Sequence, residues 1–287
     1  MHDRVQIDSN RPMVTAPGAA RPRGLLAVEV SGAGEPLVLI HGLATTARIW
    51  SAVTPALVQS RRVVTLDLPG FGASAPAGPG FELPRVAERI ARGVAARGVH
   101  APFDLVGHSL GAAVALTLAS ARPRLVRRLV LVAPAGLMPV PWPASVLLPA
   151  VAPGLHAARR AVAPLAGWPW GRRLLLGFTA ADGGDLTLAQ ARLIIDASAG
   201  AQRTAAALKT ITSTDLRPQL RASPAPLGLL WGGADRTIPA RVAATLVRSR
   251  PDAQLEIIED AGHVVMLERP AEFVAALERL LARLPKD

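Results

Sequence analysis

Three residues far apart in the chain have the side chains needed for nucleophilic catalysis: Ser109, Asp235 and His263. Ser109 lies in the sequence Gly-His-Ser-Leu-Gly at 107–111, between an apolar run and an Ala/Leu-rich stretch. A serine hydroxyl is a poor nucleophile at neutral pH, and a sharp strand-to-helix turn lifts it out of the backbone toward a base. We expect Ser109 on such a turn, flanked by glycines because a Cβ two residues before or after it would collide with the neighbouring strand or helix.

The elements that must position these residues belong to one large folding unit. The chain has 287 residues, of which 50% are hydrophobic, so it can bury a large core as one domain with an insertion. It contains no cysteine, which excludes disulfides, thiolate nucleophiles and thiolate metal sites. Tyrosine is absent as well, which removes one more general acid.

The formal net charge of +11 permits binding to nucleic acid or to an anionic membrane. The arginines, however, occur singly or in pairs, and aromatic residues make up 3% of the chain, too few for a platform on which bases stack. We therefore predict a solvated basic surface and no nucleic-acid partner. The oligomeric state is not indicated by any pattern in the sequence.

Two segments could suggest a membrane-associated or exported protein, and neither has the required pattern. Residues 1–24 are polar and rich in Pro, Gly and Arg, without the apolar core of a signal peptide, and are expected to form a flexible tail. Residues 129–158 carry no charged side chain but contain repeated prolines, which a lipid-exposed helix does not tolerate. The sequence thus predicts a cytoplasmic protein without a transmembrane segment.

Short apolar runs alternate with longer helical patterns along most of the chain. Candidate strands are 25–30, 36–40, 63–66, 103–106, 129–132, 227–231 and 255–258, and candidate helices are 48–59, 83–96, 110–121, 240–248 and 271–284. Continuously apolar strands that alternate with helices predict an α/β fold with a mostly parallel central sheet and helices on both faces.

The alternation stops between 137 and 215. This stretch is rich in proline, holds three of the five tryptophans (Trp142, Trp168 and Trp170) and has helix-like segments such as 187–211. We expect it to form a helical cap, or lid, over one end of the sheet. The remaining parts, 25–136 and 216–287, then form the core.

The candidate catalytic residues all follow predicted strands. Ser109 follows 103–106, Asp235 follows 227–231 and His263 follows 255–258. Reactive groups of an open parallel sheet gather at the carboxyl ends of its strands, so we expect these three to meet. Ser109 would attack an acyl carbon, His263 would take and return the proton, and Asp235 would orient the imidazole.

Taken together, these motifs resemble the α/β-hydrolase superfamily, in its serine esterase and lipase-like branch, over residues 25–284. In chain order they are His41-Gly42, Asp67-Leu68-Pro69-Gly70-Phe71-Gly72, the turn at Ser109, Asp235 and His263. Nucleophile, acid and base follow the order that this superfamily uses. The resemblance implies a cap inserted after the superfamily's sixth strand, and oxyanion-hole donors at the backbone amides of Leu43 and Leu110.

Other residues that resemble catalytic or metal-binding groups have simpler interpretations. Asp104 lies at the wrong end of its strand, Asp260 is too close in sequence to His263 to reach its Nδ1, and Asp67 is expected to form a turn. His41 and His108 occupy positions that the fold explains, and no carboxylate pair lies near them at ligand spacing. We therefore expect neither a metal ion nor an organic cofactor.

These observations predict a serine hydrolase that cleaves small-molecule carboxylic esters of apolar acyl groups through an acyl-enzyme intermediate. Serine at the turn argues against haloalkane dehalogenases and epoxide hydrolases, which carry aspartate there. A carbon–carbon bond hydrolase, a cofactor-free perhydrolase or haloperoxidase, and a non-catalytic ligand-binding protein remain alternatives. The apolar residues of the cap either line an acyl pocket or pack the cap onto the core; they are Leu147, Leu148, Trp168, Trp170, 174–176 and Phe178.

Overall fold

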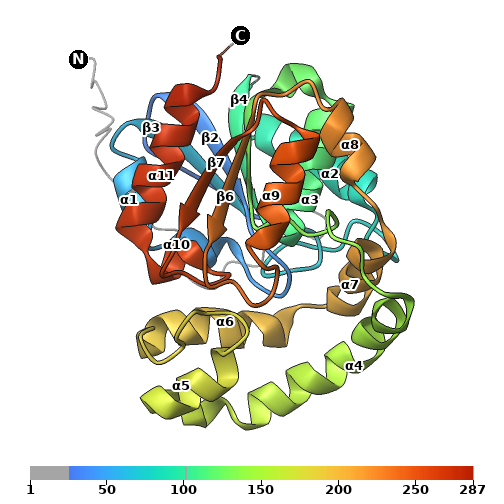
Figure 1. Ribbon diagram of the computed structural model, residues 1–287, viewed down its shortest axis with the longest axis vertical. Coiled ribbons are helices and arrows are strands. Elements are labelled where there is room, and N and C mark those ends of the chain that lie inside the picture. The colour runs from blue at the N-terminus through green and yellow to red at the C-terminus, as the bar shows by residue number, and fades with distance from the viewer. Residues whose placement is uncertain (1–25, 101, 287) are drawn as a thin grey trace, which may run out of the picture.

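The structure, a computed structural model, describes residues 26–100 and 102–286 and is shown in Figure 1. The predicted tail at 1–24 lies outside the described residues. No helix of the described chain is long and apolar enough to cross a membrane.

A seven-stranded sheet forms the centre of the molecule, in the order β1-β3-β2-β4-β5-β6-β7. Its strands are β1 (Val28–Ser31), β2 (Glu35–Ile40), β3 (Arg61–Leu66), β4 (Phe103–His108), β5 (Val126–Val132), β6 (Leu227–Gly232) and β7 (Gln254–Ile258). The edge strand β1 is antiparallel to β3, and every other pairing is parallel. The predicted α/β class with a mostly parallel sheet is confirmed, and each candidate strand is present.

Apolar side chains alternate between the two faces of the sheet and meet helices on both. On β2, Val38 and Ile40 join one core cluster, and Leu37 and Leu39 join the other. The first cluster lies under α2 (Leu83–Ala95), α3 (Leu110–Ala121), α8 (Arg217–Ala222) and α9 (Arg241–Ser249), and the second under α1 (Thr54–Leu57), α10 (Val265–Glu268) and α11 (Pro270–Arg283). Burial on both faces explains why these strands are apolar throughout.

Two predicted helices are shorter than expected. The segment 48–59 forms the 3-10 helix η1 (Ala47–Trp50) and the single turn α1, with Pro55 in the first turn of α1. Proline lacks an amide hydrogen and fits the first turn of a helix but not its interior, so one continuous helix cannot form. The segment 187–211 is likewise divided into α6 (Leu188–Gly200) and α7 (Thr204–Ser213).

Helices replace the strand–helix alternation between β5 and β6. They are α4 (Trp142–Ala161), η3 (Ala163–Gly167), α5 (Pro169–Leu176), α6 and α7, and we call them the helical insertion. Figure 1 shows them together at one end of the sheet, below the strands. The helical insertion lies between β5 and β6, directly after the strand predicted at 129–132, which is the strand that the superfamily counts as its sixth.

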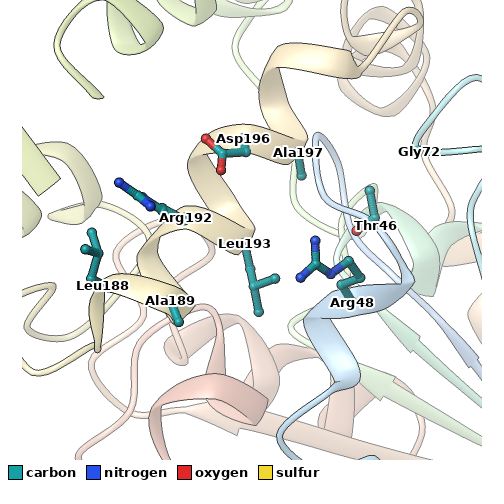
Figure 2. A pocket seen from close by; sticks show the side chains of 9 residues that line it. All are labelled: Thr46, Arg48, Gly72, Leu188, Ala189, Arg192, Leu193, Asp196 and Ala197. Atoms are coloured by element: carbon teal, nitrogen blue, oxygen red, sulfur yellow. The ribbon is translucent and has the colours of Figure 1, made fainter. Parts of the chain in front are cut away.

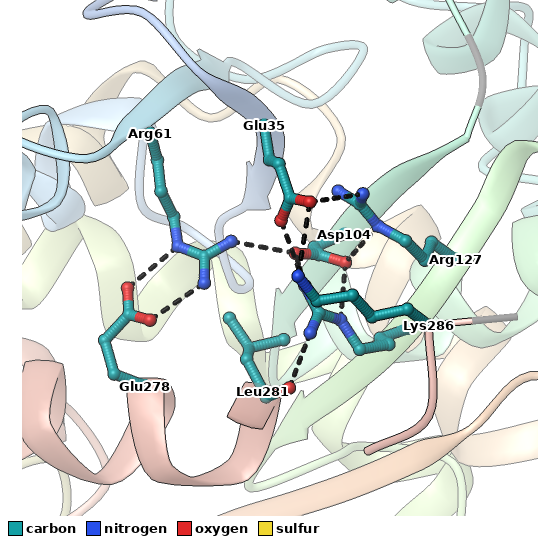
Figure 3. Close-up of polar contacts among 8 residues, drawn as sticks. Glu35, Arg61, Asp104, Arg127, Glu278, Leu281 and Lys286 are labelled. Carbon is teal, nitrogen blue, oxygen red and sulfur yellow. Dashed lines mark hydrogen bonds and ion pairs between the residues drawn. The ribbon is translucent and has the colours of Figure 1, made fainter. Parts of the chain in front are cut away.

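A buried ion-pair network joins the amino ends of the strands, at the opposite end of the sheet from Ser109 (Figure 3). Asp104 on β4 is fully buried, and its carboxylate accepts hydrogen bonds from Arg61, Arg127 and Arg128. Arg61 also forms two hydrogen bonds of 2.8 Å with Glu278 on α11. Asp104 thus holds three strands and one helix together and takes no part in the chemistry expected at the other end.

We predict that Asp104→Ala lowers the free energy of unfolding by about 3–5 kcal/mol, because it removes the fully buried carboxylate that three arginines share and leaves them only the half-exposed Glu35 and Glu278. Asp215→Ala is the control, since the Asp215–Arg217 pair is exposed and its removal should have a much smaller effect. Urea unfolding of the two variants measures both values. Equal losses for the two variants would contradict the role given to Asp104.

Candidate active site

Ser109 occupies a strained turn between β4 and α3. Its backbone has φ 52° and ψ −114°, a conformation that non-glycine residues rarely adopt. The Ser109 amide donates to the carbonyl of Val132 on β5 at 2.9 Å, and its carbonyl accepts from the Ala135 amide at 3.2 Å. These bonds hold the turn in place, as the sequence predicted for a serine raised out of the backbone.

The two glycines of the turn are required by close contacts. A Cβ on Gly107 would lie 2.4 Å from the carbonyl oxygen of Gly111. A Cβ on Gly111 would lie 2.4 Å from the carbonyl oxygens of Ile40 and His41, at the end of β2. Helix α3 therefore begins in direct contact with the sheet, which confirms the steric reason expected for both glycines.

The structure brings His263 and Asp235 together. Nδ1 of His263 donates to Oδ2 of Asp235 at 2.7 Å, and the other carboxylate oxygen accepts from the amides of Thr237 and Ile238. Asp235 follows β6 and His263 follows β7, and the Ala234 amide donates to the Ala261 carbonyl at 2.9 Å between the two loops. With its Nδ1 hydrogen directed at Asp235, the imidazole presents Nε2 as the proton acceptor.

Ser109 and His263 line the same cavity, which has a volume of about 370 Å³. Both residues, like Asp235, are at least nine-tenths buried. Within the described part of the chain the Ser109 hydroxyl has no hydrogen-bond partner. Catalytic hydrogen bonds are often long before substrate binds, so the lack of a Ser109–His263 hydrogen bond here is compatible with the roles that the sequence predicts for the two residues.

Glu268 supports residues 262–264, which we call the histidine loop. The sequence did not identify Glu268 as a functional residue. Its carboxylate accepts hydrogen bonds from the backbone amides of Gly262 and Val264, on either side of His263, and from Ala181 beyond α5. Burial raises the pKa of Glu268 above its ordinary value. Glu268 ends the short helix α10, which begins two residues after His263. A carboxylate at this spacing can reach back to the loop amides, and this is the local signal that points to its role.

His41 and His108 have structural partners. Nδ1 of His41 donates to the Gly42 carbonyl and Nε2 accepts from the Leu68 amide, both at 2.8 Å. Burial lowers the pKa of His41 to about 4 and the pKa of His108 well below its ordinary value, so both rings are neutral at pH 7. Nε2 of His108 donates to the His263 carbonyl at 2.9 Å and fixes the histidine loop from beneath.

The predicted oxyanion-hole donors are the backbone amides of Leu43, which follows β2, and Leu110, which follows Ser109 directly. Leu110 is the first residue of α3 and is fully buried, and Leu43 lines the cavity. Within the described residues, no carbonyl accepts a hydrogen bond from either amide. The amino end of a helix also carries partial positive charge, which favours an anion beside Leu110.

The sequence left two roles open for the apolar residues of the insertion, lining an acyl pocket or packing the insertion onto the core. Leu148 lines the cavity, whereas Trp168 and Phe178 are 55% and 79% exposed, and Leu176 is buried elsewhere in the core. The helical insertion is apolar on two faces, and its inward face contributes Ile194, Leu208 and Ile211 instead.

A larger hollow, of about 740 Å³, lies between α6 and η1 (Figure 2). Its wall holds Arg48, Arg192 and Asp196 but neither Ser109 nor His263. Volume alone therefore does not locate the candidate site, and the buried Asp235–His263 pair does. Among the described residues, no group of three His, Cys, Asp or Glu side chains is arranged to hold a metal ion.

Comparison with known proteins agrees with this geometry. Residues 37–276 match the model of the alpha/beta hydrolase family. The chain therefore belongs to the alpha/beta hydrolase family.

The chain is also similar to individual proteins and solved structures. The chain is 34% identical over 268 residues to a pimeloyl-[acyl-carrier protein] methyl ester esterase of Methylococcus capsulatus, covering 88% of this chain and 99% of the relative. It is 34% identical over 240 residues to the dihydrolipoyllysine-residue acetyltransferase component of the acetoin cleaving system of Pseudomonas putida, covering 82% of this chain but 60% of the relative. The bromoperoxidase structure from Bacillus anthracis superposes with a TM-score of 0.76 at 22% identity, over 89% of this chain and 94% of the other, and shows the common fold.

We predict that Gly111→Ala destabilises the protein by at least about 2 kcal/mol and displaces the turn, because the new Cβ overlaps two carbonyl oxygens of the sheet. Gly154→Ala is the matched control: Gly154 lies on α4 with open space around the added Cβ, so the change should be neutral or stabilise by up to about 1 kcal/mol. Denaturant unfolding compares the two. A Gly111→Ala variant as stable as Gly154→Ala would refute the steric account of the turn.

Proposed function

We propose that this chain is a serine hydrolase of carboxylic esters, with Ser109 as nucleophile, His263 as general base and Asp235 as the acid that orients it. The observation that carries the proposal is the buried 2.7 Å Asp235–His263 hydrogen bond at the cavity that the strained Ser109 turn also lines. A binding protein needs neither the strained turn nor a histidine held in one tautomer.

The mechanism follows from these positions. Nε2 of His263 accepts the Ser109 proton as the hydroxyl oxygen attacks the ester carbonyl, and the Asp235 carboxylate stabilises the imidazolium that forms. The Leu43 and Leu110 amides donate to the oxyanion of the tetrahedral intermediate. His263 then returns the proton to the leaving alcohol, and water hydrolyses the acyl-enzyme by the same steps, with no cofactor.

The cavity supports an apolar acyl group of modest size. Its wall includes Met138, Val140, Ile194, Leu208 and Ile211, and a volume of about 370 Å³ is at the small end for ligand sites. We propose that residues 137–215 act as a cap that supplies most of this wall, over a core of 25–136 and 216–287. The esterase name of the Methylococcus capsulatus relative supports ester substrates.

Two alternatives use the same residues. A perhydrolase or haloperoxidase would share the acyl-enzyme and differ in the second nucleophile. The bromoperoxidase from Bacillus anthracis, which has a similar fold, is the reason to test this chemistry. A carbon–carbon bond hydrolase would release a ketone or carbon acid rather than an alcohol. Product analysis distinguishes all three.

The experiment is a panel of p-nitrophenyl esters of graded chain length, assayed with the wild type and with Ser109→Ala. We expect the wild type to favour short and medium apolar acyl groups. Ser109→Ala should lose at least about 10³-fold in kcat while its unfolding transition is unchanged. Retained turnover in a folded Ser109→Ala variant would overturn the proposal.

A further inference from the structure

Arg159 adds a positively charged side chain to the wall of a mostly apolar cavity. It lies on α4 and lines the cavity that Ser109 and His263 also line. The wall as described contains no Asp, Glu or Lys, so Arg159 is its one permanently charged side chain. Nothing in the chemistry proposed for Ser109 requires a cation there.

The guanidinium of Arg159 is only partly satisfied. Its Nη2 donates to the Leu175 carbonyl at 3.0 Å, while its Nε is buried without a partner. Among the described residues, no carboxylate forms an ion pair with it. The buried arginines Arg61, Arg128 and Arg250 each have a carboxylate partner. Arg172 on α5 resembles Arg159, with backbone carbonyls as acceptors and a buried Nε without a partner, but Arg172 does not line the cavity.

An unpaired, largely buried cation is costly, and burial accordingly lowers the pKa of Arg159 below its ordinary value. A ligand anion would supply the missing partner. The planar fork of a guanidinium matches two oxygens of a carboxylate or phosphate, which a lone carbonyl cannot offer.

We propose that Arg159 binds an anionic group carried by the substrate, a carboxylate or a phosphate. This proposal rests on the proposed ester hydrolysis and names its substrate class: an ester with an apolar segment between the reacting carbonyl and an anionic end. Arg159 is then the specificity-determining residue of the helical insertion.

A purely structural role makes a different prediction. The Arg159–Leu175 hydrogen bond connects α4 to the end of α5, and a loss of this link would affect every substrate equally. Arg159→Gln keeps a donor that can reach toward Leu175 but removes the charge, and Arg159→Lys keeps the charge but removes the fork. Arg173→Gln is the matched control, because Arg173 is exposed on α5 and pairs with Asp182 at the surface.

The kinetic test compares p-nitrophenyl butyrate with mono-p-nitrophenyl glutarate and with the p-nitrophenyl ester of 4-phosphooxybutyrate. Arg159→Gln should raise KM by about 10- to 100-fold for the anionic ester or esters that bind, and change the neutral ester by no more than about 3-fold. Arg159→Lys should lie between wild type and Arg159→Gln, and Arg173→Gln should match the wild type. Equal effects of Arg159→Gln on all three esters would overturn the proposal.

A binding measurement separates this proposal from the proposed hydrolysis. Calorimetry with glutarate and with butyl phosphate, on the Ser109→Ala protein with and without Arg159→Gln, requires no turnover. We expect one or both anions to bind and to lose at least about 10-fold in affinity without the arginine. Binding that is absent, or unaffected by Arg159→Gln, contradicts the Arg159 site, whereas esterase activity absent beside intact binding contradicts the hydrolysis alone.

Discussion

The backbone conformation of Ser109, with φ 52° and ψ −114°, is the constraint on which the site depends. Such a conformation costs about 1–3 kcal/mol and persists only where the surroundings leave no alternative. Here the Ser109 amide is bonded to β5, and the glycines at 107 and 111 allow α3 to start against the carbonyls that end β2. The core of the protein thus fixes the position of one serine, and the base and acid that we propose, His263 and Asp235, lie on the loops that follow β7 and β6.

Charged groups at the two ends of the sheet have different roles. At the amino ends, Asp104 neutralises a group of buried arginines and fastens the strands together. At the carboxyl ends, burial keeps His41 and His108 neutral and leaves Asp235 to act on His263 alone. A neutral, apolar site strengthens each remaining polar interaction, and this includes the contact that we propose between Arg159 and an anionic substrate.

The sequence predicts the sheet well because burial on both faces makes a continuous apolar run in several strands, such as residues 37–40 of β2 and 129–132 of β5. It also predicts which residues meet, since Asp235 and His263 each follow a strand and parallel strands bring these ends together. It fails where tertiary contacts decide. Local pattern does not distinguish the exposed Trp168 from the cavity-lining Ile211, because the helical insertion is apolar on two faces. The hydrogen bonds of Arg159 to Leu175 and of Glu268 to Ala181 join separate segments, so the sequence alone did not assign a role to either residue.

If His263 and Asp235 activate Ser109, as we propose, Ser109 will react covalently with an electrophile that mimics an ester. The wild type and Asp235→Asn would be exposed to a fluorophosphonate probe, with the rate followed by intact mass and the modified residue mapped by peptide mass spectrometry. We expect one label, on Ser109, and a rate reduced by roughly 10³- to 10⁴-fold in Asp235→Asn, because the histidine then loses its orienting carboxylate. A label on another residue, or equal rates for the two proteins, would contradict the proposal.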